Sequence, residues 1–331
     1  FSSITWKEFK KTRGETSLMN EMSNKNKKQY FLGIDGGGTK TQLVIIDEKG
    51  SIVAEGNAGT ASIDTISFSD SFKTIQEALS KMQIDIEISG VFAGIGGIAS
   101  TEHEEAYIEG LRHITWLNQA TYIQVKNDVY GALASGNGEL QGIALILGTG
   151  AVCFGINGEK TWRCGGYHYK EGDAGSAFDV GFQALKYYAR VLDGRYLPSS
   201  FSDAIRDYLG IDDFIGLVKY FHNLERTKTA KIAPIVTSYA RSDQHAYKIV
   251  ATAADEVRLL VEGVYRQLHF QETDLVVIGG IGTADTIYKE LYAQAVLRIS
   301  PDIHIILPKY TPAYACALIA KEKTIAKQSE R

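Results

Sequence analysis

Short apolar runs separated by glycine-rich turns mark most of this sequence, and they begin after residue 29. An apolar run over 30–34 leads into the heptapeptide Asp-Gly-Gly-Gly-Thr-Lys-Thr at 35–41, and further runs follow over 42–46 and 51–55. Runs of this length between turn residues predict β-strands. The glycine loop therefore joins two strands of a hairpin, whereas a Walker loop or a GxGxxG motif opens a helix.

The same unit occurs a second time further along the chain. A strand predicted over 142–147 leads into Gly-Thr-Gly at 148–150, and two more strands are predicted over 151–156 and 161–163. A repeated unit of strand, glycine loop and strand indicates two similar α/β domains. We expect each domain to present its glycine hairpin to a shared cleft.

The segments between and after these units alternate strands with helices, which predicts an α/β fold with partly parallel sheets. Further strands are predicted over 88–93, 121–125, 274–278 and 303–307, and helices over 72–82, 102–113, 129–135, 174–192, 213–221, 232–241, 246–268 and 284–297, with a last helix from 312. We expect an N-terminal α/β domain over 30–138 and a C-terminal α/β domain over 139–310. A terminal helix over 311–331 could return to the first domain.

The first 29 residues have a different composition from the rest. They carry seven basic and three acidic residues and few aliphatic ones. No apolar segment follows the charges, as a secretory signal would require. We expect residues 1–29 to form a poorly ordered leader, with Met22 as a native start.

The overall composition narrows the class of protein. With 44% apolar and 22% charged residues, the chain is neither disordered nor collagen-like nor a coiled coil. A net charge of −4 leaves no surplus of Lys and Arg to neutralise a nucleic acid, and no apolar run of 18 residues is present to span a membrane. We therefore expect neither partner. The 33 glycines against five prolines indicate loops whose backbone lies close to a ligand.

Three cysteines without a CxxC pair fit a reducing, cytoplasmic location. Their odd number argues against a disulfide framework, and their spacing argues against a cysteine zinc site.

Glycines at the tip of a hairpin let the backbone present N–H groups to phosphate oxygens. Asp35, at the end of the first strand, could hold Mg²⁺ through water, because Mg²⁺ takes only one or two carboxylates. A lone glycine loop is more often a tight turn with an Asx cap. The second loop at the matching place favours phosphate binding for both.

Two aspartates precede predicted helices, and each has two interpretations. Asp128 follows a strand, where it could take a proton from an attacking hydroxyl or serve as a plain helix N-cap. Asp173 could bind ligand hydroxyls, cap the following helix, or do both. Tyr167 could stack on a ligand or pack in the core. The pair Gly279-Gly280 could let a flat base approach the backbone, which a bare glycine pair supports only weakly.

Taken together, these motifs resemble one family in order and spacing. The chain is similar to the N-acetylglucosamine kinase family, grouped with the BadF/BcrA-type ATPases in the superfamily of sugar kinases, actin and heat-shock chaperones. The resemblance covers about 30–320. It rests on the motifs at 35–41, 127–128, 148–150, 172–176 and 279–280.

This resemblance implies two duplicated ribonuclease H-like domains with a nucleotide cleft between them, and a kinase that uses ATP and Mg²⁺ on an amino sugar such as N-acetylglucosamine. Asp128 would be the general base, and Asp35 would serve Mg²⁺. ATP would be bound by Gly36, Gly37, Gly38, Thr39, Lys40, Gly148, Thr149, Gly150, Gly279 and Gly280. The sugar would be bound by Gly166, Tyr167 and Asp173, with Ser62 and Asp64 from the first domain.

Three positions depart from the family pattern. Ser62, with Asp64 nearby, occupies the place of a sugar-site Asn, and Ala174 replaces the Glu of Gly-Asp-Glu-Gly-Ser. Ala315-Cys316 stands where Gly-Ala is common. The first two changes fall beside the sugar, so they bear on which sugar is used and leave phosphoryl transfer untouched.

Other functions fit part of the pattern. An ATPase that drives conformational change in a partner enzyme would share the phosphate loops, but it would need iron–sulfur cysteines, and none lies in the segment 172–176. A non-catalytic sensor would need neither Asp35 nor Asp128. The zinc-containing sugar kinases are excluded because their clustered-cysteine motif is absent. A kinase for a different sugar and a homodimer both remain open.

Overall fold

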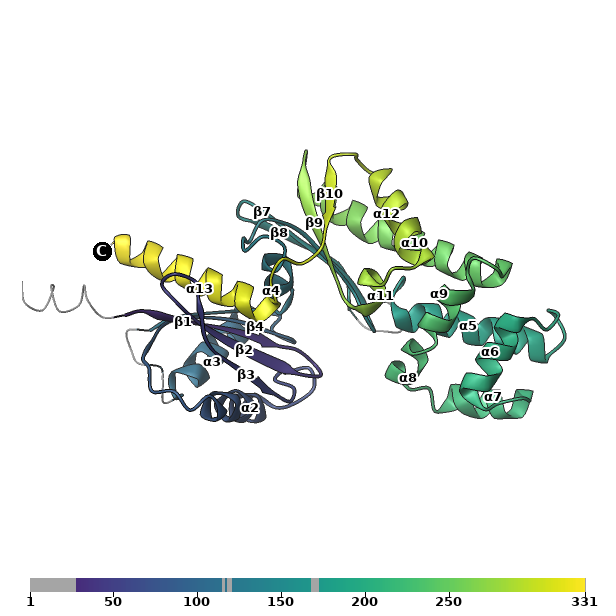
Figure 1. Cartoon of the computed structure of the whole chain (residues 1–331), viewed down its shortest axis with the longest axis horizontal. Coiled ribbons are helices and arrows are strands. Elements are labelled where there is room, and N and C mark those ends of the chain that lie inside the picture. Colours follow the sequence, from purple (N-terminus) through teal and green to yellow (C-terminus); the bar gives the residue numbers. More distant parts are fainter. Residues whose placement is uncertain (1–27, 115–116, 118–120, 168–172, 331) are drawn as a thin grey trace, which may run out of the picture.

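The computed structural model describes residues 28–114, 117, 121–167 and 173–330. The chain forms two lobes, each built around a five-stranded mixed sheet (Figure 1). The expected leader over 1–29 lies almost wholly outside the described residues. No helix in the described ranges is long and apolar enough to cross a bilayer.

The first sheet is formed by the predicted strands, which lie close to their expected positions. Its strands are β1 (Tyr30–Gly36), β2 (Thr41–Asp47), β3 (Ile52–Ala58), β4 (Ile88–Ile95) and β5 (Tyr122–Lys126). Their order is β3-β2-β1-β4-β5. The hairpin strands pair antiparallel, whereas β4 runs parallel to β1 and β5 parallel to β4.

The second sheet repeats this arrangement. Its strands are β6 (Gly142–Leu147), β7 (Ala151–Asn157), β8 (Lys160–Gly165), β9 (Thr273–Ile278) and β10 (Ile303–Ile306). The order β8-β7-β6-β9-β10 matches the first sheet strand for strand, and so do the strand directions. The duplicated α/β fold expected from the sequence is therefore confirmed.

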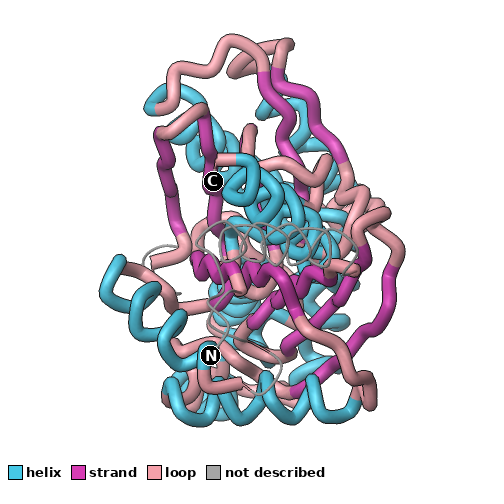
Figure 2. Tube along the Cα trace, turned by 90° about the vertical axis from the view of Figure 1, so that its left-hand side faces the viewer, coloured by secondary structure: helices cyan, strands magenta, loops and turns pink. Residues whose placement is uncertain are grey.

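Helices cover both faces of the first sheet (Figures 1 and 2). On one face, α2 (Phe68–Lys81) and α3 (Thr101–Arg112) share a core with the strands. On the other face lies α13 (Pro312–Ser329), which the chain reaches by crossing back from β10. The approach is close, because a Cβ on Gly33 would lie 2.0 Å from the carbonyl oxygen of Ala313. The last helix is thus packed directly onto β1.

The short helix α4 (Val129–Ala134) lies between the two sheets. Val129 and Leu133 pack in one apolar cluster with Phe154 and Val276 of the second lobe. The backbone carbonyl of Ser135, just after α4, accepts hydrogen bonds from the segment that leads into α13. Asp128, at the start of α4, therefore stands at the junction of the lobes.

The remaining helices belong to the second lobe. They are α5 (Ala177–Leu192), α6 (Ser200–Leu209), α7 (Phe214–His222), α8 (Arg226–Ala230), α9 (Ala233–Tyr239), α10 (Gln244–Gln267), α11 (Gly280–Thr283) and α12 (Ile287–Leu297). Helices α5, α10 and α12 share the largest core with the second sheet.

Several helix boundaries differ from the prediction, for local reasons. Helix α5 begins at Ala177 and not at 174, because Gly175 has a left-handed φ of 83° that no helical residue adopts and Ser176 caps the helix. Helix α2 begins earlier than expected, with Ser67 as its cap.

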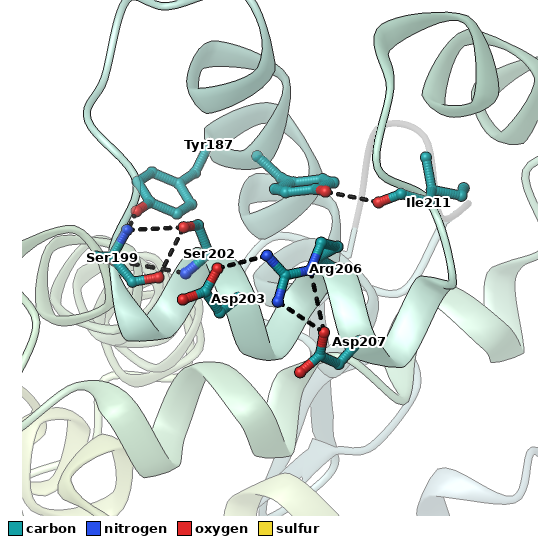
Figure 3. Close-up of polar contacts among 8 residues, drawn as sticks. Tyr187, Ser199, Ser202, Asp203, Arg206, Asp207 and Ile211 are labelled. Atoms are coloured by element: carbon teal, nitrogen blue, oxygen red, sulfur yellow. Dashed lines mark hydrogen bonds and ion pairs between the residues drawn. The ribbon is translucent and has the colours of Figure 1, made fainter.

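Helix α6 was not predicted. It starts at a capping box between Ser199 and Ser202 and is tied to α5 through the hydroxyl of Tyr187 (Figure 3). Ser in place of the usual Glu at the third helical position hides this start from a motif search.

Candidate active site

Asp35 and Asp128 come from neighbouring parts of the first sheet. Asp35 ends β1 and pairs with Gly94 of the parallel strand β4. A Cβ on Gly94 would lie 3.3 Å from the Cα of Asp128, so the missing side chain lets the start of α4 approach the sheet. The two aspartates expected to serve Mg²⁺ and to act as base therefore lie at the same edge.

Both carboxyl groups have a raised pKa, mainly because they are buried. Burial raises the pKa of Asp35 to about 7, with a further contribution from the charge of Asp128, while Lys40 opposes the shift. Burial also raises the pKa of Asp128, and Arg163 opposes that shift. Both aspartates are surrounded by protein yet partly accessible. A bound cation would favour their ionised forms.

The structure decides against one interpretation of Asp128. The residue stands at the N-cap position of α4, but its side chain makes no capping hydrogen bond. Its carboxylate is therefore not used as a cap, and the nearby backbone N–H groups of Asp128 and Val129 favour its ionised form.

Ser62 and Asp64, the first-lobe residues that the resemblance assigns to the sugar, lie beside Asp128. A Cβ on Gly96 would lie 2.6 Å from Ser62 Oγ and 3.4 Å from an Asp128 carboxylate oxygen. A Cβ on Gly97 would lie 2.7 Å from the backbone nitrogen of Asp64, whose charge adds to the raised pKa of Asp128. The two glycines after β4 thus let this loop close around Asp128.

The first glycine loop is a tight turn with an exposed tip. Gly37 N donates to the carbonyl of Lys40 at 3.1 Å, and the Thr60 hydroxyl donates to the carbonyl of Gly37 at 3.0 Å. Gly38, Thr39 and Lys40 are exposed, whereas Gly36 is buried in the sheet. The turn and the phosphate-binding interpretations are compatible, because the tip leaves its backbone accessible.

Asp173 is fastened to the second glycine loop. One carboxylate oxygen accepts from Ala151 N at 3.2 Å, and the other accepts from Arg226 Nη2 at 2.5 Å. The side chain is only 3% exposed. Within the loop, Gly148 N donates to the carbonyl of Gly150 at 2.9 Å.

The interpretation of Asp173 as the cap of α5 is wrong, since Ser176 fills that role. Asp173 instead joins β7 to α8. The preceding residues of this motif, 168–172, lie outside the described residues.

Gly166 and Tyr167 follow β8 in a tight turn. Gly165 and Gly166 both have left-handed backbones, with φ of 73° and 66°. Tyr167 is 73% exposed, and its hydroxyl lies 3.4 Å from the Arg163 carbonyl. Tyr167 is therefore not a core residue, which leaves its ring available for a ligand.

The two glycines after β9 have different environments. A Cβ on Gly279 would lie 2.3 Å from the carbonyl oxygen of Leu147, and its φ is 96°. Gly279 is thus explained by its backbone conformation and by its contact with the end of β6. A Cβ on Gly280 would meet nothing within 4 Å. Of these two glycines, Gly280 is the one with space for the nucleobase of ATP beside it.

A cavity of about 560 Å³ opens beside the second glycine loop. It lies between α5 and the end of α7, and its lining includes Asp173, Ala174, Phe178, Phe182, Lys186 and His222. One lining residue, Phe178, is bonded to the loop, because its backbone N–H donates to the carbonyl of Thr149 at 3.3 Å.

Two arginines of the site were not found in the sequence. Arg226 lies 53 residues beyond Asp173, so no local pattern could pair them. Arg163 directly precedes Cys164-Gly165-Gly166, and its position before a predicted ligand loop was the available signal. Of the predicted site residues, Asp35, Ser62 and Asp64 lie near Asp128, and Gly150 lies beside Asp173. Gly166 and Tyr167 contact Arg163, whose charge lowers the pKa of Asp128.

Comparisons with known proteins identify the family of the chain and its relatives. The family described as the BadF/BadG/BcrA/BcrD ATPase family matches residues 32–320. An N-acetylmuramic acid/N-acetylglucosamine kinase of Clostridium acetobutylicum is 29% identical over 89% of this chain and 99% of its own. An N-acetyl-D-glucosamine kinase of Dictyostelium discoideum is 23% identical over 88% of this chain and 98% of its own.

The fold is shared with solved structures. A Chromobacterium violaceum protein described as a candidate N-acetylglucosamine kinase superposes with a TM-score of 0.69 at 22% identity, covering 88% of this chain and 99% of its own. With the sequence match over most of its length, the chain belongs to the BadF/BadG/BcrA/BcrD ATPase family.

Proposed function

We propose that this protein is an ATP-dependent kinase that phosphorylates a hydroxyl of an amino sugar such as N-acetylglucosamine. The observation that carries the proposal is the uncapped carboxylate of Asp128, which stands at the junction of the lobes beside Ser62, Asp64 and Asp35. The relatives that match nearly the whole chain are amino-sugar kinases by name, which supports the acceptor class.

Asp128 is suited to accept the proton of an attacking hydroxyl. Its raised pKa makes it a stronger base than an exposed aspartate, while Arg163 limits the rise. Ser62 and Asp64 would orient the sugar on the first-lobe side. From the second lobe, the sugar would meet Gly166, Tyr167 and Asp173.

The residues around Asp35 fit a magnesium ion. Mg²⁺ prefers oxygen ligands and needs only one or two carboxylates, and two carboxylates with raised pKa values share this edge of the sheet. Asp35 would hold the ion through water. When bound, Mg²⁺ would neutralise charge on the phosphates of ATP.

The two glycine loops would hold the phosphates from opposite lobes. The exposed tip at Gly38, Thr39 and Lys40 would contact ATP from the first lobe, and Gly148, Thr149 and Gly150 from the second. Closure of the lobes would then exclude water from the γ-phosphate. Gly280, with open space beside it, would lie on the adenosine side.

The acceptor is tested by ADP release against a panel of sugars. We expect N-acetylglucosamine or N-acetylmuramic acid to raise ADP release from ATP at least about tenfold above the sugar-free rate, with glucosamine and glucose weaker. Because Ser62 and Ala174 depart from the family pattern beside the sugar, the panel also measures which amino sugar is preferred. ADP release that no sugar changes would contradict the kinase and support an ATPase that acts on a partner enzyme.

A further inference from the structure

One arginine of the second lobe connects the expected sugar loop with the expected base. Arg163 lies on β8, and its guanidinium donates from Nε to the carbonyl of Gly165 at 3.2 Å and from Nη2 to the carbonyl of Gly166 at 2.6 Å. These two glycines form the left-handed turn that precedes Tyr167. Two carbonyls of one turn are therefore held by one planar, forked group.

The turn and the guanidinium are packed against each other. A Cβ on Gly166 would lie 2.8 Å from Arg163 Nη2 and 2.8 Å from the Cβ of Val152. The glycine is needed for its backbone conformation and also for this contact. The path of the loop toward Tyr167 thus depends on where the arginine lies.

The same side chain faces the other lobe. Arg163 is the direct strand partner of Phe154, so both side chains lie on one face of the sheet. The ring of Phe154 lies 4.8 Å from that of Tyr130, which follows Asp128 by two residues on α4. This packing brings Arg163 close to Asp128.

The charges around Asp128 show what the arginine contributes. Asp64 from the loop after β3 and Asp35 from β1 are acidic, and the buried thiol of Cys316 from α13 lies near both Asp35 and Asp128. Arg163 is the positive group among the described residues that shift the pKa of Asp128. Without it, the charged groups that shift the pKa of Asp128 would all be acidic, and the backbone N–H groups of Asp128 and Val129 would be left to favour its ionised form.

We infer that Arg163 is a positioning residue for phosphoryl transfer, which holds the Gly165–Gly166 turn at the acceptor and sets its positive charge opposite Asp128. This inference rests on the proposed function. It assigns two separable tasks to one side chain. The forked guanidinium binds the carbonyls of the loop, and its positive charge favours the ionised form of Asp128.

The test compares two substitutions with a matched control. In Arg163→Gln both tasks are lost, so we expect KM for the amino sugar to rise and kcat to fall, each about tenfold, with KM for ATP within about twofold of wild type. In Arg163→Lys the charge returns, but an ammonium lacks the fork. Its kcat should recover while KM for the sugar stays raised. Lys160→Gln removes an exposed charge from the same strand and should change neither.

A purely structural role would give a different pattern. Equal losses for sugar and ATP with a lowered melting temperature, or a Lys variant no better than Gln in kcat, would overturn the inference. Wild-type kinetics in Arg163→Gln would do the same. These outcomes differ from failure of the proposed function, in which the wild-type protein itself would release no ADP in response to any amino sugar.

Discussion

The two lobes share one topology but treat their acidic residues in opposite ways. In the first lobe, Asp35 and Asp128 form no ion pair with the described residues, and the pKa of each is raised although Lys40 and Arg163 oppose the shifts. In the second lobe, Asp173 is bonded to Arg226 and to a backbone N–H. The first arrangement suits proton transfer and metal binding, and the second holds the Asp173 carboxylate in a fixed position. The two lobes therefore share a strand order and differ in the charges that surround their aspartates.

The largest effects on the two lobes are expected from the left-handed glycines that follow β4 and β9. Gly97 and Gly279 both have left-handed backbones and close neighbours, so Ala at either should cost about 3 kcal/mol of folding free energy. Urea denaturation measures this loss. At temperatures where both variants fold, Gly97→Ala should mainly raise KM for the sugar, because it displaces Asp64. Gly279→Ala should mainly raise KM for ATP, because it displaces the second loop at Leu147.

The neighbouring Gly280 provides the control for the second lobe. A Cβ on Gly280 would meet nothing within 4 Å, so Gly280→Ala should fold with wild-type stability. It should change KM for ATP and leave KM for the sugar unchanged. A large loss of stability in Gly280→Ala, or none in Gly279→Ala, would contradict the assignment.

The Arg226–Asp173 ion pair of the second lobe should stabilise the fold. Arg226→Gln leaves the carboxylate of Asp173 buried with one donor fewer, and we expect a loss of about 2 kcal/mol, reduced from the value for a fully buried pair because Arg226 is partly exposed. Chemical denaturation with Arg195→Gln, an exposed arginine with a surface ion pair, serves as the reference. Equal stability of both variants would show that the pair contributes nothing.

The raised pKa of Asp35 in the first lobe should make the stability of the protein depend on pH. Because the pKa of Asp35 is raised to about 7, the folded protein holds this proton more tightly than the unfolded chain does. The resulting stability is complete below about pH 4 and is lost as the pH rises through about 7. Asp35→Asn should therefore stabilise the protein by about 3 kcal/mol more at pH 8 than at pH 5, without ATP or Mg²⁺.

Thermal unfolding of wild type and variant at both pH values measures this difference. A stabilisation that does not change with pH would show that Asp35 is not held neutral by its surroundings. Mg-ATP should stabilise wild type at pH 8 and stabilise the variant less.

Local pattern was enough to predict the sheets and the aspartates of the first lobe. Strand, glycine loop and strand are contiguous in sequence. Asp35 lies near the end of β1 and Asp128 just after β5, at the same edge of the sheet. The features that the sequence did not predict depend on single backbone angles or on partners that are distant in sequence. The left-handed Gly175 delays α5, and Arg226 meets Asp173 only after three intervening helices. No periodicity encodes either.

The most direct test of the account is sugar-dependent turnover in Asp128→Asn, with Asp85→Asn, an exposed aspartate of the same lobe, as the control. The amide keeps the shape of the side chain but accepts no proton, so kcat should fall about a thousandfold while ATP affinity stays within about twofold of wild type. The control should be fully active. Near-normal turnover in Asp128→Asn would contradict the central claim that this carboxylate is the base of an amino-sugar kinase.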